Sequence, residues 1–172
     1  MEIRKSTQHD MGDLLSLFDE ARSTIAALGI DQWQNGYPSR EVVDEDIALA
    51  RSYAVTDEGG ALCGTFVLIE DGEPTYDTIY DGHWRTGDDS QDYLAIHRVA
   101  VSVRVRGKGI STAIIDHAAA RARALGRASL RIDTHHGNVV MRRMLEKHGF
   151  VYCGVIYLAN GDPRVAYERI LE

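Results

Sequence analysis

The spacing of hydrophobic positions changes along the chain, and each change predicts a different element. Early in the sequence, apolar residues recur every three or four positions, which is the period of a helix with one buried face. Thr7 and Ser39 precede two such stretches and can cap the helices, and Gly29 ends the first. The first part is predicted to hold these two helices, the second running to about Ala50, and strands at 2–6, 52–56 and 61–70.

The later part of the chain alternates strands with helices. Its predicted elements are strands at 93–101, 128–133, 150–158 and 164–171, and helices at 107–125 and 138–148. This alternation favours a central sheet with helices on its faces. The turn at 160–162 is short enough to make the last two strands antiparallel, so the sheet is mixed. Residues 71–91 are acidic and rich in tyrosine, and they indicate a functional loop or a short helix.

Composition predicts one ordinary domain. The chain has 172 residues, of which 44% are hydrophobic and 26% charged, so it can bury a core. No apolar run reaches the roughly 20 residues of a membrane span, and the charged start is unlike a signal peptide. The two cysteines, Cys63 and Cys153, are far apart and fit a reducing compartment. We therefore expect a cytoplasmic protein with no membrane partner.

Charge is divided unequally between the two halves. Residues 1–96 carry 20 acidic and 6 basic side chains, whereas residues 97–172 carry 6 acidic and 13 basic ones. Two solvated faces that happen to differ would explain this. Alternatively, the basic half holds an anionic cofactor and the acidic half attracts a cationic substrate. The net charge of −7 and the lack of a nucleic-acid-binding motif argue against a nucleic acid partner.

The segment 99–112 (VAVSVRVRGKGIST) has the chemistry of a diphosphate site. Three cations, Arg104, Arg106 and Lys108, are interleaved with Gly107 and Gly109 between a strand and a helix. Glycines let a backbone approach a ligand, and the N–H groups at a helix start favour an anion. No acid occurs between positions 92 and 116. The alternative is a plain strand–helix connection with a basic surface.

Three phosphate motifs are candidates for this segment. A Walker loop requires Gly-Lys-Ser/Thr and fails, because Gly109 follows Lys108. A dinucleotide fingerprint has Thr112 in place of its third glycine, although Asp133 follows a second strand about 20 residues on. An NAD(P)-binding oxidoreductase thus stays an alternative. The pattern Arg/Gln-x-x-Gly-x-Gly/Ala is matched in full by Arg104, Gly107 and Gly109.

With this motif the sequence resembles the GNAT superfamily of N-acetyltransferases, bacterial type. Val99–Val101 leading into Arg104–Gly109 looks like its first core motif, and Asn138–Phe150 (NVVMRRMLEKHGF), about 30 residues on, looks like its second. The resemblance covers nearly the whole chain. It implies a single α/β (α+β) domain over 1–172, with a mostly antiparallel sheet, a splayed central strand pair and helices on both faces. Residues 1–96 would be mainly the acceptor side and 97–158 the acetyl-CoA-binding core.

The resemblance also implies a reaction: direct transfer of acetyl from acetyl-CoA to a primary amine of a small molecule, a peptide N-terminus or a lysine, in a ternary complex. We expect the amine to be cationic, and family habit suggests a homodimer. The backbone of Val99 and Val101 would pair with the pantetheine arm, and Asn138 would bond that arm from the neighbouring element. The amides that would hold the pyrophosphate are those of Arg104, Arg106, Gly107, Lys108, Gly109, Ile110 and Ser111.

His97 is the candidate general base. Imidazole titrates near neutral pH, and in an unbroken strand His97 shares a face with Val99 and Val101. A bulge would change that face, and a structural histidine at the core edge is the alternative. The family's usual acid, a tyrosine seven residues after the asparagine, is replaced by Leu145. This departure leaves open a non-catalytic acyl-CoA sensor as an alternative. Tyr152 and Tyr157 are other candidates for the acid that protonates the thiolate, but no spacing supports them.

Other chemistry is weaker. Trp33 and Tyr37 lie in a predicted loop, where they either cover the core or form a wall for a cationic acceptor. Asp133, His135 and His136 are spaced poorly for one ion, so we predict no metal. Neither cysteine has a flanking histidine motif, which argues against a covalent intermediate.

Overall fold

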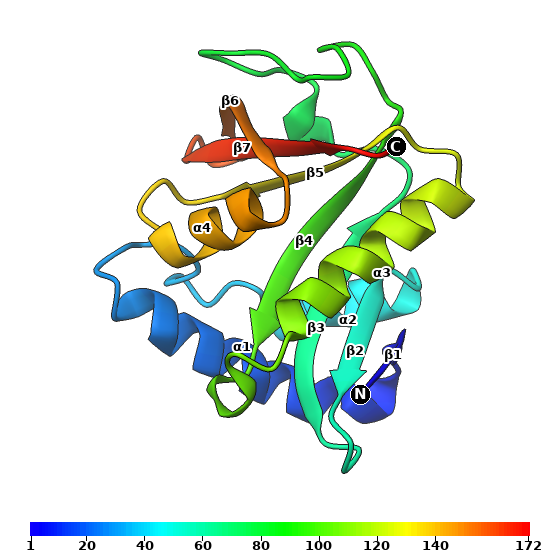
Figure 1. Ribbon diagram of the computed structural model, residues 1–172. Coiled ribbons are helices and arrows are strands. Elements are labelled where there is room, and N and C mark those ends of the chain that lie inside the picture. Colours follow the sequence, from blue (N-terminus) through cyan, green and yellow to red (C-terminus); the bar gives the residue numbers. More distant parts are fainter. The chain divides into compact units, whose positions relative to one another are not determined.

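The computed structural model describes residues 1–172 as a mixed α/β fold (Figure 1). Its helices are α1 (Met11–Ala26), α2 (Arg40–Ala48), α3 (Ile110–Ala124) and α4 (Val139–Lys147), with 3-10 turns η1 (Gln8–Asp10), η2 (Pro74–Tyr76) and η3 (Val103–Val105). Its strands are β1 (Glu2–Lys5), β2 (Ser52–Thr56), β3 (Leu62–Ile69), β4 (Tyr93–Val101), β5 (Ser129–Thr134), β6 (Val151–Tyr157) and β7 (Pro163–Ile170). Seven strands in the order β1-β2-β3-β4-β5-β7-β6 make the mixed, mostly antiparallel sheet that the sequence predicts. No helix is both long and apolar enough to cross a membrane.

The chain contacts divide into two compact units. The first unit holds Met1–Leu68 and Arg98–Ile114, and the second holds Ile69–His97 and Ile115–Glu172. The boundaries fall inside β3, β4 and α3, so each of these elements contributes residues to both units.

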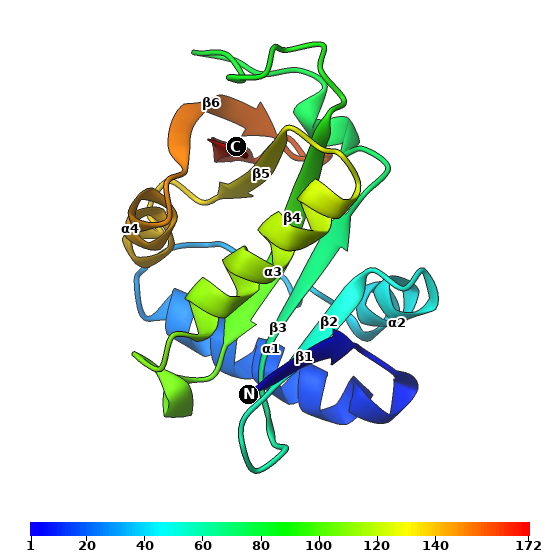
Figure 2. The same ribbon diagram turned by 45° about the vertical axis from the view of Figure 1, so that its right-hand side comes forward.

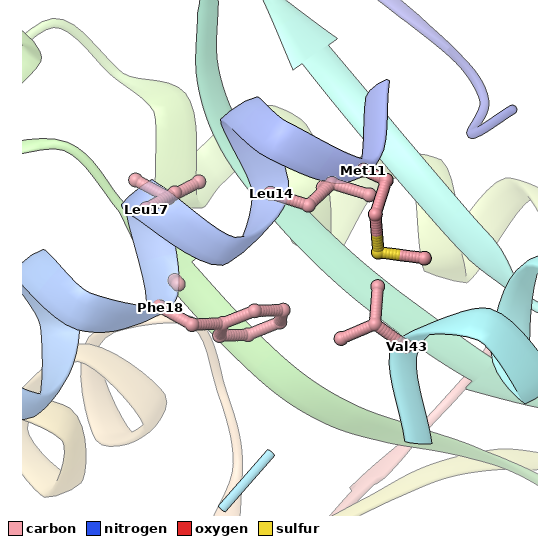
Figure 3. Close-up of a cluster of buried hydrophobic side chains, with 6 residues drawn as sticks. Met11, Leu14, Leu17, Phe18 and Val43 are labelled. Atoms are coloured by element: carbon pink, nitrogen blue, oxygen red, sulfur yellow. The ribbon is translucent and has the colours of Figure 1, made fainter. Parts of the chain in front are cut away.

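The first unit has a core between α1, α2 and its strands. Figure 3 shows Met11 and Phe18 of α1 directed toward Val43 of α2, and Leu14 and Leu17 of α1 belong to the same buried cluster. Ala100 of β4 completes this buried cluster. The Ser39 hydroxyl accepts a hydrogen bond from the backbone N–H of Val42 and so caps α2, as predicted. Strands β1, β2 and β3 pair antiparallel, with Thr56 opposite both Glu2 and Leu62.

The second unit is built on β5. This strand pairs antiparallel with β7 along its whole length, and β7 pairs with β6. With β4 it forms a short parallel ladder that ends at Ala95 and Arg131, although both strands continue. This early end of the pairing is the splay between the two central strands that the resemblance implied. Figures 1 and 2 show α4 beside β5 and β7, and the guanidinium of Arg142 donates to the Tyr167 hydroxyl at 2.9 Å.

Two predicted elements differ from the structure. The helix predicted from Gly107 starts three residues later as α3, because Gly107 and Gly109 have φ of +75° and +78°, which no right-handed helix accommodates. The segment 71–91 contains a short helical turn, η2, and its other residues are held by hydrogen bonds within the second unit. Tyr80 exchanges two backbone hydrogen bonds of 2.8 Å with Val155 and thereby pairs with part of β6.

Candidate active site

The glycine-containing turn before α3 is held in place from within the first unit. The Ser102 hydroxyl caps η3 by accepting from the backbone N–H of Arg104, and the Ser102 N–H donates to the carbonyl of Cys63. Glu20 of α1 accepts from the Val103 N–H at 2.5 Å. A Cβ at Gly107 or Gly109 would meet no protein atom, so the positive φ alone explains these glycines.

The turn is suited to an anion. Arg104, Arg106 and Lys108 are all exposed, and Arg104 also donates to the Leu62 carbonyl at 3.2 Å. Helix α3 begins at Ile110, so its first N–H groups have no carbonyl partner within the helix and carry the positive end of its dipole. Backbone donors at the helix start and three cations form a donor set that fits a pyrophosphate, and the one acid on the turn, Glu20, is already paired with Ser102 and Val103 at its far end.

The strand that enters this turn is interrupted at Arg98. Its φ of +52° lies in the left-handed region, which is unusual for a residue inside a strand. The alternation of faces therefore breaks there, and the expectation that His97 shares a face with Val99 and Val101 rests on a continuity that β4 does not have. Val99 and Val101 are half-buried, on either side of the buried Ala100.

His97 lies beside a carboxylate that sequence reasoning missed. Its Nε2 is 3.0 Å from Oε2 of Glu73, the residue that caps η2, and each side chain is 19% exposed. The approach is close but poorly aligned, so Nε2 makes no well-directed hydrogen bond. Burial raises the pKa of Glu73, but the interactions with His97 and Thr75 outweigh it and bring the pKa down to about 2. Glu73 is therefore an anion at neutral pH.

An aromatic ring stacks on this pair. The Tyr76 and His97 ring centroids are 5.8 Å apart, with planes inclined by 20°. The Tyr76 hydroxyl donates to Oδ2 of Asp133 at 2.7 Å. Burial and the neighbouring Asp133 raise the pKa of Tyr76 well above its ordinary value, so this phenol keeps its proton.

Asn138 and Leu145, from the second predicted motif, both have structural roles within the second unit. The Asn138 side chain caps α4 by accepting from the Met141 N–H at 3.2 Å. Leu145, where the family's tyrosine is expected, is fully buried, so the position holds a packing residue. Tyr152 and Tyr157 are 45% and 47% exposed and contact Tyr167 and Tyr80 respectively.

Trp33 and Tyr37 lie together in the first unit. Their ring centroids are 6.4 Å apart, and Trp33 packs edge-on against Phe18 of the core cluster. The Tyr37 hydroxyl accepts from Nε of Arg98 at 2.7 Å, and the Arg98 guanidinium also pairs with Asp46 at 3.1 Å. Both aromatics are half-buried, so they partly cover the core and partly face outward.

The other candidate groups have local partners. Asp133 accepts from Tyr76, and Nδ1 of His135 accepts from the Gly137 N–H. Both cysteines are free thiols, and burial raises the pKa of each, to about 11 for Cys153. A thiol in that state is a poor nucleophile, in agreement with direct transfer.

A buried ion pair was also missed. Arg131 and Glu168 are 1% and 0% exposed and lie 3.0 Å apart. Glu168 further accepts from the Ser129 hydroxyl and from the N–H groups of Arg85 and Thr86 in the loop before β4. The signal available in the sequence was Arg131 between Leu130 and Ile132 in a predicted strand, whereas Glu168 is followed by Arg169 and gave no such signal.

Comparisons place this geometry in a known class, the acetyltransferases. Residues 18–150 match the family described as Acetyltransferase (GNAT) family, and the chain belongs to that family. A GNAT-family acetyltransferase structure from Streptococcus agalactiae is 34% identical, with a TM-score of 0.84 over 99% of this chain and 95% of that one. No curated protein sequence matches significantly.

More distant solved structures share the fold. A putative phosphinothricin N-acetyltransferase is 16% identical, with a TM-score of 0.69 over 99% of this chain and 98% of that one. A phosphinothricin acetyltransferase from Sinorhizobium meliloti, solved in complex with AcCoA, is 15% identical, with a TM-score of 0.67 over 99% and 88%. The family uses acetyl-CoA, and membership removes the support for a dinucleotide-binding oxidoreductase.

Proposed function

We propose that this chain moves an acetyl group from acetyl-CoA to a primary amine by direct transfer in a ternary complex. The observation that carries the proposal is the turn from Arg104 to Gly109, with its two left-handed glycines and cations at the start of α3. We assign the pyrophosphate to the amides from Arg104 to Ser111 and the pantetheine arm to Val99, Val101 and Asn138. Acetyl-CoA supplies the acetyl thioester.

His97 acts as the general base. A protonated amine cannot attack a thioester, so a general base must first take its proton. His97 has the chemistry for this, and the adjacent Glu73 anion stabilises the imidazolium that forms. The backbone N–H of Val99 donates to the carbonyl oxygen as negative charge develops there. Since Leu145 offers no proton, the thiolate takes one from solvent.

The acceptor is a cationic amine at Trp33 and Tyr37. The excess of acidic residues in 1–96 supports the charge, and aromatic faces attract cations. The name of one structural relative, an N-acetyltransferase, supports nitrogen as the acceptor atom. We further propose a single domain over 1–172, with 1–96 mainly on the acceptor side and 97–158 as the cofactor core, working as a homodimer in the cytoplasm. Its free thiols accord with that compartment.

The first test is thermal unfolding with acetyl-CoA, with NAD and ATP as controls. A ligand at 100 times its dissociation constant adds about 2.7 kcal/mol of stability. Of the three ligands, only acetyl-CoA should raise the melting temperature. A panel of amines incubated with acetyl-CoA and the protein should then identify an acceptor by the release of free CoA thiol. Binding without transfer to any amine would favour a non-catalytic acyl-CoA sensor, for which the buried Leu145 is the supporting observation.

The second test concerns the base. His97→Ala should lower kcat about 10²- to 10⁴-fold, the usual contribution of a general base, with acetyl-CoA affinity kept. His83→Ala is the matched control, because His83 also pairs with a carboxylate, Asp88, but its side chain is 84% exposed. An unchanged kcat across pH in His97→Ala would refute the assignment.

A further inference from the structure

We propose that Glu73 is a positioning residue for His97. Its carboxylate keeps the imidazole proton on Nε2, so that the lone pair of Nδ1 takes the proton from the acceptor amine. This inference rests on the proposed function, and it adds the tautomer, the accepting atom and the residue that selects both.

The two carboxylate oxygens of Glu73 have separate roles. Oε1 accepts from the backbone N–H of Thr75 at 3.2 Å and from its hydroxyl at 2.9 Å. Oε2 is the oxygen that lies 3.0 Å from Nε2 of His97. Because Thr75 holds the first oxygen, the carboxylate cannot rotate without losing two hydrogen bonds, and the second oxygen stays directed to the imidazole.

The backbone of Glu73 is also fixed. Its N–H donates to the hydroxyl of Tyr93 at 2.9 Å. Tyr93 and His97 both belong to β4, two positions apart on each side of Ala95, so one strand holds the imidazole and also anchors the residue that faces it. Strand β4 therefore sets the distance between the Glu73 carboxylate and the His97 imidazole, and a strand is more rigid than a loop.

The plane of the imidazole is set by Tyr76. The two rings are nearly parallel, and Tyr76 is itself held at both ends. Its hydroxyl donates to Asp133, and its carbonyl accepts from the indole N–H of Trp84 at 3.0 Å. With Tyr76 against the ring and Glu73 at Nε2, the orientation of His97 is determined before any substrate binds.

The charges around His97 support the same tautomer. The titratable groups that face the imidazole are Glu73 at its edge and Tyr76 on its face, with Tyr93 and Asp133 behind them. Glu73 is ionised, because its pKa is about 2, and can only accept a hydrogen bond. Tyr76 keeps its proton, and its hydroxyl donates a hydrogen bond to Asp133. The anion 3.0 Å from Nε2 repels a lone pair at that nitrogen and so favours a proton on Nε2.

The reaction balances with these groups alone. The bound ammonium first gives one proton to Nδ1, which releases it to solvent. The neutral amine nitrogen then forms a bond to the acetyl carbon, its second proton passes to Nδ1, and the C–S bond breaks with its electron pair on sulfur. His97 is then an imidazolium with N–H groups on both nitrogens, and the Glu73 anion stabilises it across 3.0 Å. The proton leaves to solvent, and the thiolate takes a proton from solvent in turn.

Glu73→Gln is the sharp perturbation. The amide still accepts from Thr75, but it presents an N–H to Nε2, which favours a proton on Nδ1 and so blocks the accepting atom. We expect kcat to fall about 10- to 100-fold, part of the effect of losing the base, with the KM for acetyl-CoA unchanged.

The matched control is Asp88→Asn, which removes the carboxylate from the exposed His83 pair in the same unit. It should leave kcat unchanged. Glu73→Asp should recover part of the lost kcat, because it restores the carboxylate. A role of Glu73 in stability alone would lower the melting temperature of Glu73→Gln without lowering kcat, and that result would overturn the proposal.

A second readout needs no turnover. ¹⁵N NMR of the histidine side chains reports which ring nitrogen carries the proton. His97 should show the Nε2–H tautomer in the wild type and change toward Nδ1–H in Glu73→Gln, and the same tautomer in both would overturn the proposal. If the wild type transfers no acetyl group to any amine, the proposed function fails while NMR still decides the role of Glu73.

Discussion

Gly107→Ala tests the cofactor turn with a magnitude that the structure supplies. Gly107 has φ of +75°, and a Cβ there would meet no protein atom, so the cost to folding is conformational. An alanine in the left-handed region costs about 1–2 kcal/mol, less a few tenths gained from a stiffer unfolded chain. For a chain of this size, each kcal/mol lowers the melting temperature by about 2–4 °C.

Gly29→Ala provides the control. Its φ is +74°, and a Cβ there also meets nothing, so the two variants should lose the same stability without ligand. Only Gly107→Ala places a methyl group where we assign the pyrophosphate. If its affinity falls tenfold, acetyl-CoA at 100 times the wild-type dissociation constant adds about 1.4 kcal/mol to it, against about 2.7 kcal/mol for the wild type and for Gly29→Ala.

The assay is thermal unfolding of the three proteins with and without acetyl-CoA, supported by calorimetric titration. Equal ligand-induced shifts in Gly107→Ala and Gly29→Ala would refute the reasoning, because the phosphates would then bind away from this turn. A loss of the shift in both variants would refute it equally, since Gly29 lies three residues after the end of α1 and has no part in the proposed site.

The remaining predictions concern two ion pairs. Glu168→Ala leaves the buried Arg131 charge without its carboxylate and should cost about 3–5 kcal/mol, measurable by urea unfolding; a loss below 1 kcal/mol would contradict it. The pKa of Asp10 falls from 3.8 to about 2, chiefly through its hydrogen bonds with Arg4, so the stability it provides is complete above pH 3.8 and is lost as pH falls toward 2. Asp10→Asn should remove this component, and a wild-type-like dependence of unfolding free energy on pH between 2 and 5 would argue against it.

Local signals explain why much of the fold was predictable. Ser39 caps the helix that follows it, as its side chain suggested, because capping involves residues only three positions apart. The bounds of β2 and β4 also agree, since each is a run of β-forming residues ending in turn chemistry. The family followed from the Arg104–Gly109 turn, which is continuous in sequence.

Features that depend on distant contacts escaped prediction. The pairs Glu73–His97 and Tyr76–Asp133 join a segment without periodicity to strands far along the chain, and no local pattern links them. The left-handed φ of Arg98 has no sequence signature either, because arginine is not a residue type that favours it. The helix predicted from Gly107 began too early because the glycines were counted into it, although they form the turn before it.

The carboxylate of Glu168 gives the loop before β4 an unusual dependence. The amides of Arg85 and Thr86 donate to its Oε2, and its other oxygen, Oε1, pairs with Arg131. If this loop peeled away, it would expose a charge pair that is otherwise dry and leave it short of donors. Opening this segment would therefore expose a buried ion pair, so we expect it to open together with the strands beneath it and not as a separate lid.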